Sequence, residues 1–147
     1  MKKFIKYLIQ LYTKIQNKLP SHPIIHLPLS KVDIEPIIMI PGSSATENRF
    51  NKMVRKLNHG QHPHHSLIRI KVWNDGRMTY RGHLKRKDRN PIFVIGFQNN
   101  RDGYKNIKKQ AAMFNAAITV LREKYSFTRF KGLGHSNGGL VYTVFLQ

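Results

Sequence analysis

Residues 130–140 constrain the fold more than any other part of the chain, because they contain the pattern Gly134-x-Ser136-x-Gly138. In this pattern a strand turns sharply into a helix, with a serine in a strained conformation at the apex. The flanking glycines let neighbouring backbone pack closely without a Cβ clash. An apolar run, Leu140–Leu146, follows and predicts a buried helix. The pattern favours a nucleophilic serine at position 136, and an ordinary glycine turn is the alternative.

Two other apolar runs predict the sheet that carries this turn. Pro36–Ile40 and Pro91–Phe97 are apolar almost throughout, as are strands buried on both faces of a parallel sheet. A further strand is expected at Arg129–Leu133. Between the last two strands, apolar residues recur at helical spacing and predict a crossover helix, at Ile107, Ala111, Phe114, Ile118, Leu121 and Tyr125.

A β-hairpin is expected between the two apolar strands. Leu67–Trp73 alternates apolar and basic residues, which indicates a strand with one solvated face. Asn74-Asp75-Gly76 is a tight-turn signal, and residues 77–81 form the returning strand. The whole order predicts an α/β fold: a mostly parallel sheet with crossover helices, plus a β-hairpin insertion.

The loop after the first strand is expected to start a helix. Ser44-x-x-Glu47 matches a capping box, and apolar residues follow at helical spacing, at Phe50, Met53, Val54 and Leu57. A strand, a glycine turn and a helix N-terminus in succession expose backbone N–H groups to an anion.

The net charge and the residue types indicate which classes of binding partner are expected. Lys and Arg total 26 against 7 Asp and Glu, a formal net charge of +19, which attracts polyanions. The chain carries no helix-turn-helix, zinc-finger or RNA-recognition signature, so no specific nucleic acid is expected. Cysteine is absent, which excludes disulfides and thiolate metal sites. We expect no metal and no cofactor, and we interpret the histidine cluster as a surface loop, although imidazoles could hold zinc, at His59, His62, His64 and His65.

Residues 1–19 form a separate element in the predicted organisation. Their apolar residues repeat at helical spacing opposite a lysine-rich side, and the apolar stretch is too short to span a bilayer. Such a basic amphipathic helix can lie on an anionic membrane surface. A helix packed on its own domain and a degenerate secretion signal are equally open. Residues 20–35, rich in proline, are expected to be a linker, and residues 36–147 the main domain.

Three stretches, residues 36–51, 91–103 and 132–140, together resemble the alpha/beta hydrolases described as cell-surface hydrolases of unknown function. The resemblance implies that Ser136 attacks an ester or related acyl substrate. It implies oxyanion donors at the backbone N–H groups of Asn137 and Ser43. Pro41-Gly42 stands where superfamily members often carry His-Gly, and His135 would support the turn without acting as the base. The resemblance also implies a cell-surface or membrane-associated location, and a cytoplasmic one stays open.

The end of the sequence departs from this superfamily, in which an acid and then a histidine follow the nucleophile. Asn137–Gln147 contains no Asp, Glu or His. We therefore expect a partial hydrolase domain, truncated before its acid and histidine and weak or inactive alone, with an unpaired edge beside the serine strand. A triad rebuilt from His83 and Asp102 is the less favoured solution. The alternative function is a non-catalytic basic protein that binds anionic membrane or cell-wall polymer through residues 1–19 and 85–89.

Overall fold

The computed structural model describes residues 33–60 and 64–147. The predicted helix at residues 1–19, most of the expected linker and His62 lie outside these ranges. Ile34, in the last part of that linker, is buried at 4% exposure, and Glu35 N donates a hydrogen bond to Arg89 O at 2.8 Å.

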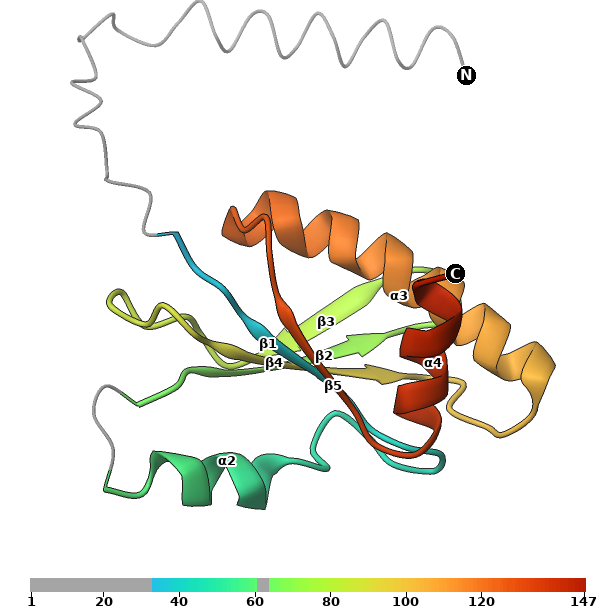
Figure 1. The fold of residues 1–147 in the computed structure, drawn as a ribbon, viewed down its shortest axis with the longest axis horizontal. Coiled ribbons are helices and arrows are strands. Elements are labelled where there is room, and N and C mark those ends of the chain that lie inside the picture. The colour runs from blue at the N-terminus through green and yellow to red at the C-terminus, as the bar shows by residue number, and fades with distance from the viewer. Residues whose placement is uncertain (1–32, 61–63) are drawn as a thin grey trace, which may run out of the picture. The chain divides into compact units, whose positions relative to one another are not determined.

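A five-stranded sheet in the order β3-β2-β4-β1-β5 organises the described residues (Figure 1). β1 (Ile37–Ile40) pairs in parallel with β4 (Ile92–Phe97) on one side and with β5 (Lys131–Gly134) on the other. β2 (Leu67–Val72) is parallel to β4, and β3 (Met78–Arg81) returns antiparallel to β2. The predicted α/β fold, with a mostly parallel sheet and one hairpin, is confirmed.

Helices cover both faces of the sheet. α2 (Asn51–Asn58) packs on one face, while α3 (Tyr104–Tyr125) and α4 (Asn137–Phe145) lie on the other (Figure 1). All five apolar positions that predicted α3 from residue 107 to 121 are buried, so its expected face is confirmed. None of the helices within the described ranges is long and apolar enough to cross a membrane.

The predicted capping box at Ser44 and Glu47 is wrong. The helix begins at Asn51, and Phe50 at its N-cap makes no side-chain capping bond. Tertiary contacts compete for the loop: Ser44 N donates to Asn100 O at 3.3 Å, and a Cβ at Gly96 would lie only 2.7 Å from Glu47 N. These contacts hold the loop in turns, and they prevail over the local helix signal.

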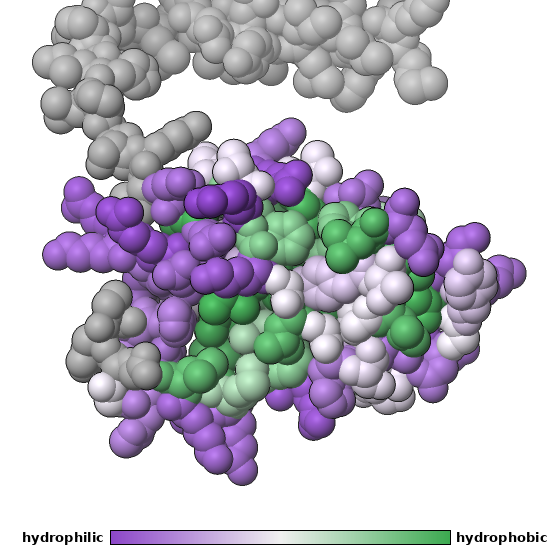
Figure 2. Space-filling model, in the orientation of Figure 1, coloured by the Kyte–Doolittle hydropathy of each residue, from purple (hydrophilic) through white to green (hydrophobic). Residues whose placement is uncertain are grey.

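The helix after the serine is less buried than its apolar sequence predicted. In α4 only Gly138 and Val141 are buried, while Leu140 is 53% exposed. β5 is the edge strand of the described sheet, as expected, and Leu133 on it is 38% exposed. Figure 2 shows hydrophobic side chains gathered at the centre of the visible face, with hydrophilic ones around them. The apolar residues of α4 and β5 therefore form a surface that the other described residues leave partly exposed.

Candidate active site

Ser136 occupies a strained turn between β5 and α4. Its backbone angles are φ 53° and ψ −121°, a region that L-residues rarely adopt. Both pattern glycines are sterically required, since a Cβ at Gly138 would lie 2.1 Å from Ile40 O and one at Gly134 would lie 2.5 Å from Gly138 C. His135 N donates to the same Ile40 carbonyl at 3.0 Å and ties the turn to β1. The sharp strand-to-helix turn predicted from the sequence is therefore present.

A cavity of about 390 Å³ and one of about 350 Å³ lie on different sides of this turn. The smaller is the one that Ser136 lines, together with Gly42, Ser43, Ser44, Ala45, Arg49 and His135. Ser44 also has a left-handed backbone, with φ 59°. Two strained serines therefore line one cavity at the carboxyl edge of the parallel strands, where α/β proteins place their ligands.

Two backbone N–H groups near this cavity are free to donate. Within the described ranges, Ser43 N and Asn137 N make no hydrogen bond, and neither does Ser136 Oγ. Asn137 is the first residue of α4, whose N-terminal end carries partial positive charge. These are the two donors that the family resemblance implied for an oxyanion. Asn137 follows Ser136 in the chain, and Ser43 lines the same cavity as Ser136.

The loop that follows β4 joins the two sides of the cavity. Asn100 Nδ2 donates to Ala45 O at 2.5 Å, on the loop after β1. Asp102 Oδ1 accepts a hydrogen bond of 2.5 Å from Asn137 Nδ2, at the start of α4. The loop after β4 is therefore hydrogen-bonded both to the loop that contains Ser43 and to the start of α4 at Asn137.

His83 and Asp102 do not come together. Asp102 lies beside the serine turn, at the carboxyl edge of the parallel strands. His83 follows Gly82, whose Cβ position would lie 2.1 Å from the carbonyl oxygen of Leu67, the first residue of β2. The two side chains thus belong to opposite edges of the sheet, and the less favoured triad hypothesis is wrong. His135 lines the cavity with an exposed side chain.

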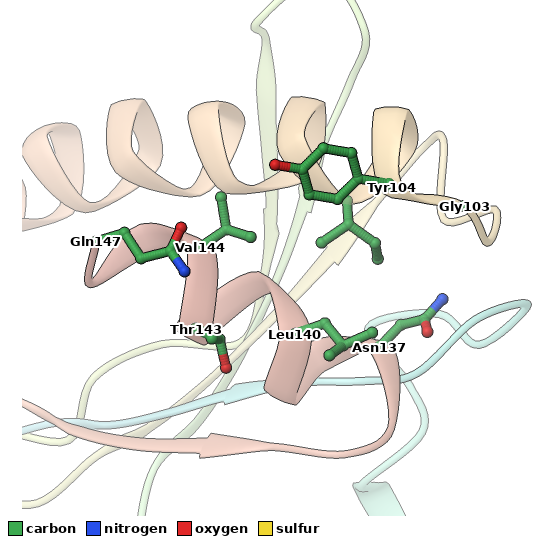
Figure 3. Close-up of a pocket in the computed structure, with 8 residues that line it drawn as sticks. Gly103, Tyr104, Asn137, Leu140, Thr143, Val144 and Gln147 are labelled. Carbon is green, nitrogen blue, oxygen red and sulfur yellow. The ribbon is translucent and has the colours of Figure 1, made fainter.

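The larger pocket, of about 390 Å³, is mainly apolar and lies between the start of α3 and α4 (Figure 3). Asn137 lines it but Ser136 does not, and the remaining lining residues are Gly103, Tyr104, Ile107, Leu140, Thr143, Val144 and Gln147. Asn137 therefore stands between an apolar pocket and the polar cavity of the serine.

Tyr142 fixes α4 beneath the turn. Its hydroxyl donates to Ile38 O at 2.8 Å, and its ring fills the space where a Cβ at Gly132 would fall, at 2.9 Å. Burial raises the pKa of the Tyr142 phenol far above its ordinary value. The phenol is therefore a structural donor that links α4 to β1.

The described histidines of the predicted surface loop do not form a metal centre. Asn58 Nδ2 donates to His65 O at 3.0 Å, and His65 Nδ1 lies 2.7 Å from Asn90 O. Among residues 33–60 and 64–147, no group of three or more His, Cys, Asp or Glu could hold a metal ion. The contacts of His65 tie the loop to the start of β4.

The geometry and the sequence agree with one family. The family described as alpha/beta hydrolase of unknown function (DUF915) matches residues 26–147. The chain belongs to this family. The resemblance stated from the three sequence stretches is thus confirmed, and no curated protein matches the chain.

Two solved structures are similar to this alpha/beta hydrolase. One is a protein described as a cell surface hydrolase from Lactobacillus plantarum WCFS1, with 46% identity and a TM-score of 0.70, covering 77% of this chain and 45% of that one. The other is a gene product from Listeria innocua, with 30% identity and a TM-score of 0.66, covering 77% of this chain and 44% of that one. The matched part of this chain therefore spans less than half the length of either solved protein.

Sequence reasoning missed three residues at the site. Asn100 and Arg49 entered the sequence analysis only inside the stretches 91–103 and 36–51, and Asp102 only as a partner for His83. A usable signal was present, because the polar residues 99–103 directly follow a buried strand and so fall at the carboxyl edge of the sheet.

Proposed function

We propose that this alpha/beta hydrolase is a serine hydrolase, with Ser136 as the nucleophile acting on an ester or a related acyl substrate. The observation that supports this most is the strained backbone of Ser136, φ 53°, at a turn between a parallel strand and a helix. A structural turn would be less costly with glycine at that position, so a serine there needs a reason of its own.

The proposed chemistry follows from the groups around the cavity. Ser136 Oγ attacks the acyl carbon while a base removes its proton, and the carbonyl oxygen becomes an oxyanion. The N–H groups of Asn137 and Ser43 would donate to that oxyanion. Collapse of the tetrahedral species expels the alcohol, which takes the proton back, and water then releases the acid from the acyl-serine in the same manner.

We include in the proposal that the base and its acid come from outside residues 1–147. In support, Ser136 Oγ contacts no described histidine by a hydrogen bond, and both solved relatives are more than twice as long as the part they share with this chain. We also propose a cell-surface location, because one of these relatives is described as a cell surface hydrolase. Membrane contact through residues 1–19 stays a prediction.

A fluorophosphonate probe, which acylates activated serines, tests the assignment. The protein is isolated from its native source, its intact mass is measured, and the labelled peptide is identified. We expect labelling at Ser136 that Ser136→Ala abolishes. Ser43→Ala is the matched control, because it removes a serine from the same cavity yet keeps the backbone N–H, and labelling should persist.

Two results would contradict the proposal. One is labelling that survives Ser136→Ala. The other is a folded native protein, carrying an acid and a histidine beyond Gln147, that reacts with no acyl-serine probe. For residues 1–147 alone we expect weak labelling or none, and strong labelling of that chain would refute the external base.

A further inference from the structure

The β2–β3 hairpin has one apolar face and one basic face. The side chains of Ile68, Ile70 and Val72 are buried in the core cluster that contains α3. The residues between them, Arg69 and Lys71, therefore project on the opposite face. The strand register places Arg69 directly opposite Arg81, and Lys71 directly opposite Thr79. The cations of both strands thus share one surface.

These cations form no ion pair among the described residues, and the nearby carboxylate of Glu47 packs against Gly96, the register partner of Lys71. Within the described ranges the ion pairs are Arg77–Asp75 and Lys131–Glu35, so Arg69, Lys71 and Arg81 have no carboxylate partner there. Arg69 Nε is buried without a hydrogen-bond partner. Like charges directly opposite on neighbouring strands repel each other, and a buried unpaired guanidinium nitrogen is costly. An anion on this face would relieve the repulsion between the cations.

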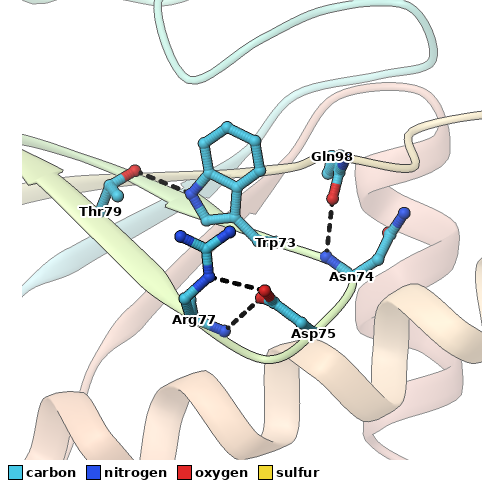
Figure 4. A network of polar contacts seen from close by, with 6 residues as sticks. All are labelled: Trp73, Asn74, Asp75, Arg77, Thr79 and Gln98. Atoms are coloured by element: carbon cyan, nitrogen blue, oxygen red, sulfur yellow. Dashed lines mark hydrogen bonds and ion pairs between the residues drawn. The ribbon is translucent and has the colours of Figure 1, made fainter.

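At the hairpin end Trp73 positions Lys71 and one further cation, Arg77, which Figure 4 shows beside the indole. Lys71 Nζ lies 4.3 Å from the centre of the Trp73 ring, and Arg77 Cζ lies 5.5 Å from it. The indole is itself fixed, since Trp73 Nε1 donates to Thr79 Oγ1 at 3.2 Å. Because cations already lie against the ring, it is poorly placed to stack on a base. The Trp73 ring instead holds the cationic groups of Lys71 and Arg77 in place on the hairpin.

The basic face leads toward the cavity of Ser136. Arg69 Nη1 donates to Asn48 Oδ1 at 3.2 Å, which brings the hairpin against the loop before α2. The next residue, Arg49, lines the cavity with Ser136 and is exposed. Arg49, Arg69, Lys71 and Arg81 are called the basic strip below, and it begins at the serine.

We propose that the basic strip binds a polyanionic polymer and that, resting on the proposed function, this polymer carries the acyl group presented to Ser136. Alternate residues of a strand lie about 6.8 Å apart, which suits a chain whose anionic groups recur. Lipid insertion would need exposed apolar side chains, and the large exposed apolar residues of the described ranges lie outside the strip, at Leu57, Tyr104, Val120, Leu133, Leu140 and Leu146.

Binding can be measured without any catalysis. The probe is sodium polyphosphate, the protein is the full chain with Ser136→Ala, and the fluorescence of Trp73, the one tryptophan of the sequence, reports binding next to the strip. Lys71→Glu with Arg81→Glu is compared with Lys105→Glu and Lys108→Glu, two exposed α3 lysines that give the same change in net charge. We expect at least a tenfold weaker affinity for the strip pair, about twofold for the control pair, and a smaller salt slope only for the strip pair.

Folding and binding are separable in this design. Arg81→Glu puts a carboxylate opposite Arg69, so its thermal unfolding temperature should stay the same or rise while polyphosphate affinity falls. Equal weakening by both pairs would overturn the proposal, because it would mean attraction by net charge alone. Tighter strip-dependent binding of phosphatidylglycerol vesicles than of polyphosphate would overturn the polymer as the occupant. Tighter binding of single-stranded DNA would overturn the acyl-bearing polymer, because DNA carries no acyl group. In the native protein, polyphosphate should slow fluorophosphonate labelling. Failure of labelling itself would refute the serine hydrolase but leave the measured binding in place.

Discussion

Replacing Gly138 by alanine should destabilise the protein, although alanine is the better helix former. Gly138 is the second residue of α4, and a Cβ there would lie 2.1 Å from Ile40 O and 2.8 Å from Ile40 C. The carbonyl cannot simply move, because it belongs to β1, which is paired with a strand on each side, and accepts the hydrogen bond of 3.0 Å from His135 N. The clash therefore forces α4 away from β1, or breaks that bond.

The expected cost follows from these contacts. Relieving the clash requires a backbone shift of about 1 Å, and overpacking of this kind typically costs about 1–3 kcal/mol. Loss of the His135 hydrogen bond would add about 1 kcal/mol. The higher helix propensity of alanine returns about 0.5–1 kcal/mol. The net loss in the free energy of unfolding is thus about 2 kcal/mol.

Gly139 provides a matched control one residue away. A Cβ at Gly139 would meet its nearest atom, Gly134 O, at 3.9 Å, which is an ordinary contact. Gly139→Ala should therefore stabilise the protein by about 0.5–1 kcal/mol through helix propensity. Urea unfolding followed by Trp73 fluorescence and by circular dichroism gives both values. With a slope of about 2 kcal/mol per M, the two midpoints should differ by roughly 1.5 M.

The relative stability of Gly138→Ala and Gly139→Ala tests whether α4 packs closely on β1. If Gly138→Ala is as stable as Gly139→Ala, the close approach of α4 to β1 does not exist in solution. The serine turn would then have no steric need for glycine at position 138. A loss shared equally by both variants would likewise refute it, since only Gly138 faces the Ile40 carbonyl.

Three further predictions concern the same turn. Asp102→Ala should slow fluorophosphonate labelling at Ser136 by about tenfold, because Asn137 Nδ2 loses its hydrogen-bond acceptor. Asp102→Asn should restore part of the labelling rate, because its amide oxygen can accept the same hydrogen bond. Tyr142→Phe should cost about 1 kcal/mol at neutral pH, measured by urea unfolding, through the lost bond to Ile38 O. Since burial raises the pKa of Tyr142, the unfolded phenol ionises first, so stability should fall as pH rises above about 10, less steeply in Tyr142→Phe. Ser136→Gly should raise stability by about 1 kcal/mol by relieving the left-handed backbone, and a destabilised variant would contradict the strain.

The sheet and its main helix could be predicted because buried elements require apolar residues in a recognisable pattern. β1 and β4 are covered on both faces, so their residues are almost all apolar, and α3 repeats its buried residues at helical spacing. The serine turn could be predicted because its geometry admits only glycine at 134 and 138. In each case a local pattern and the tertiary structure favour the same conformation.

The loops that complete the site could not be predicted in this way. Ser44 and Glu47 satisfy a capping-box pattern, yet the bond from Ser44 N to Asn100 O and the packing of Glu47 on Gly96 depend on a strand some fifty residues later. The tie between Asp102 and Asn137 likewise spans 35 residues. Side-chain bonds between distant loops leave no periodicity in the sequence, so only the position of the loops at the carboxyl edge was foreseeable.

The non-glycine residues with left-handed backbone fall at two kinds of place in the described structure, a helix end and the cavity of Ser136. Within the described ranges three serines adopt it, Ser44, Ser126 and Ser136. Ser126 ends α3, a place where a left-handed residue is the common way to terminate a helix. Ser44 and Ser136 end no helix, each costs about 1–3 kcal/mol, and both line the same cavity. Backbone strain is therefore concentrated where the N–H groups of Ser43 and Asn137 are free, and this is the physical reason for placing the proposed chemistry there.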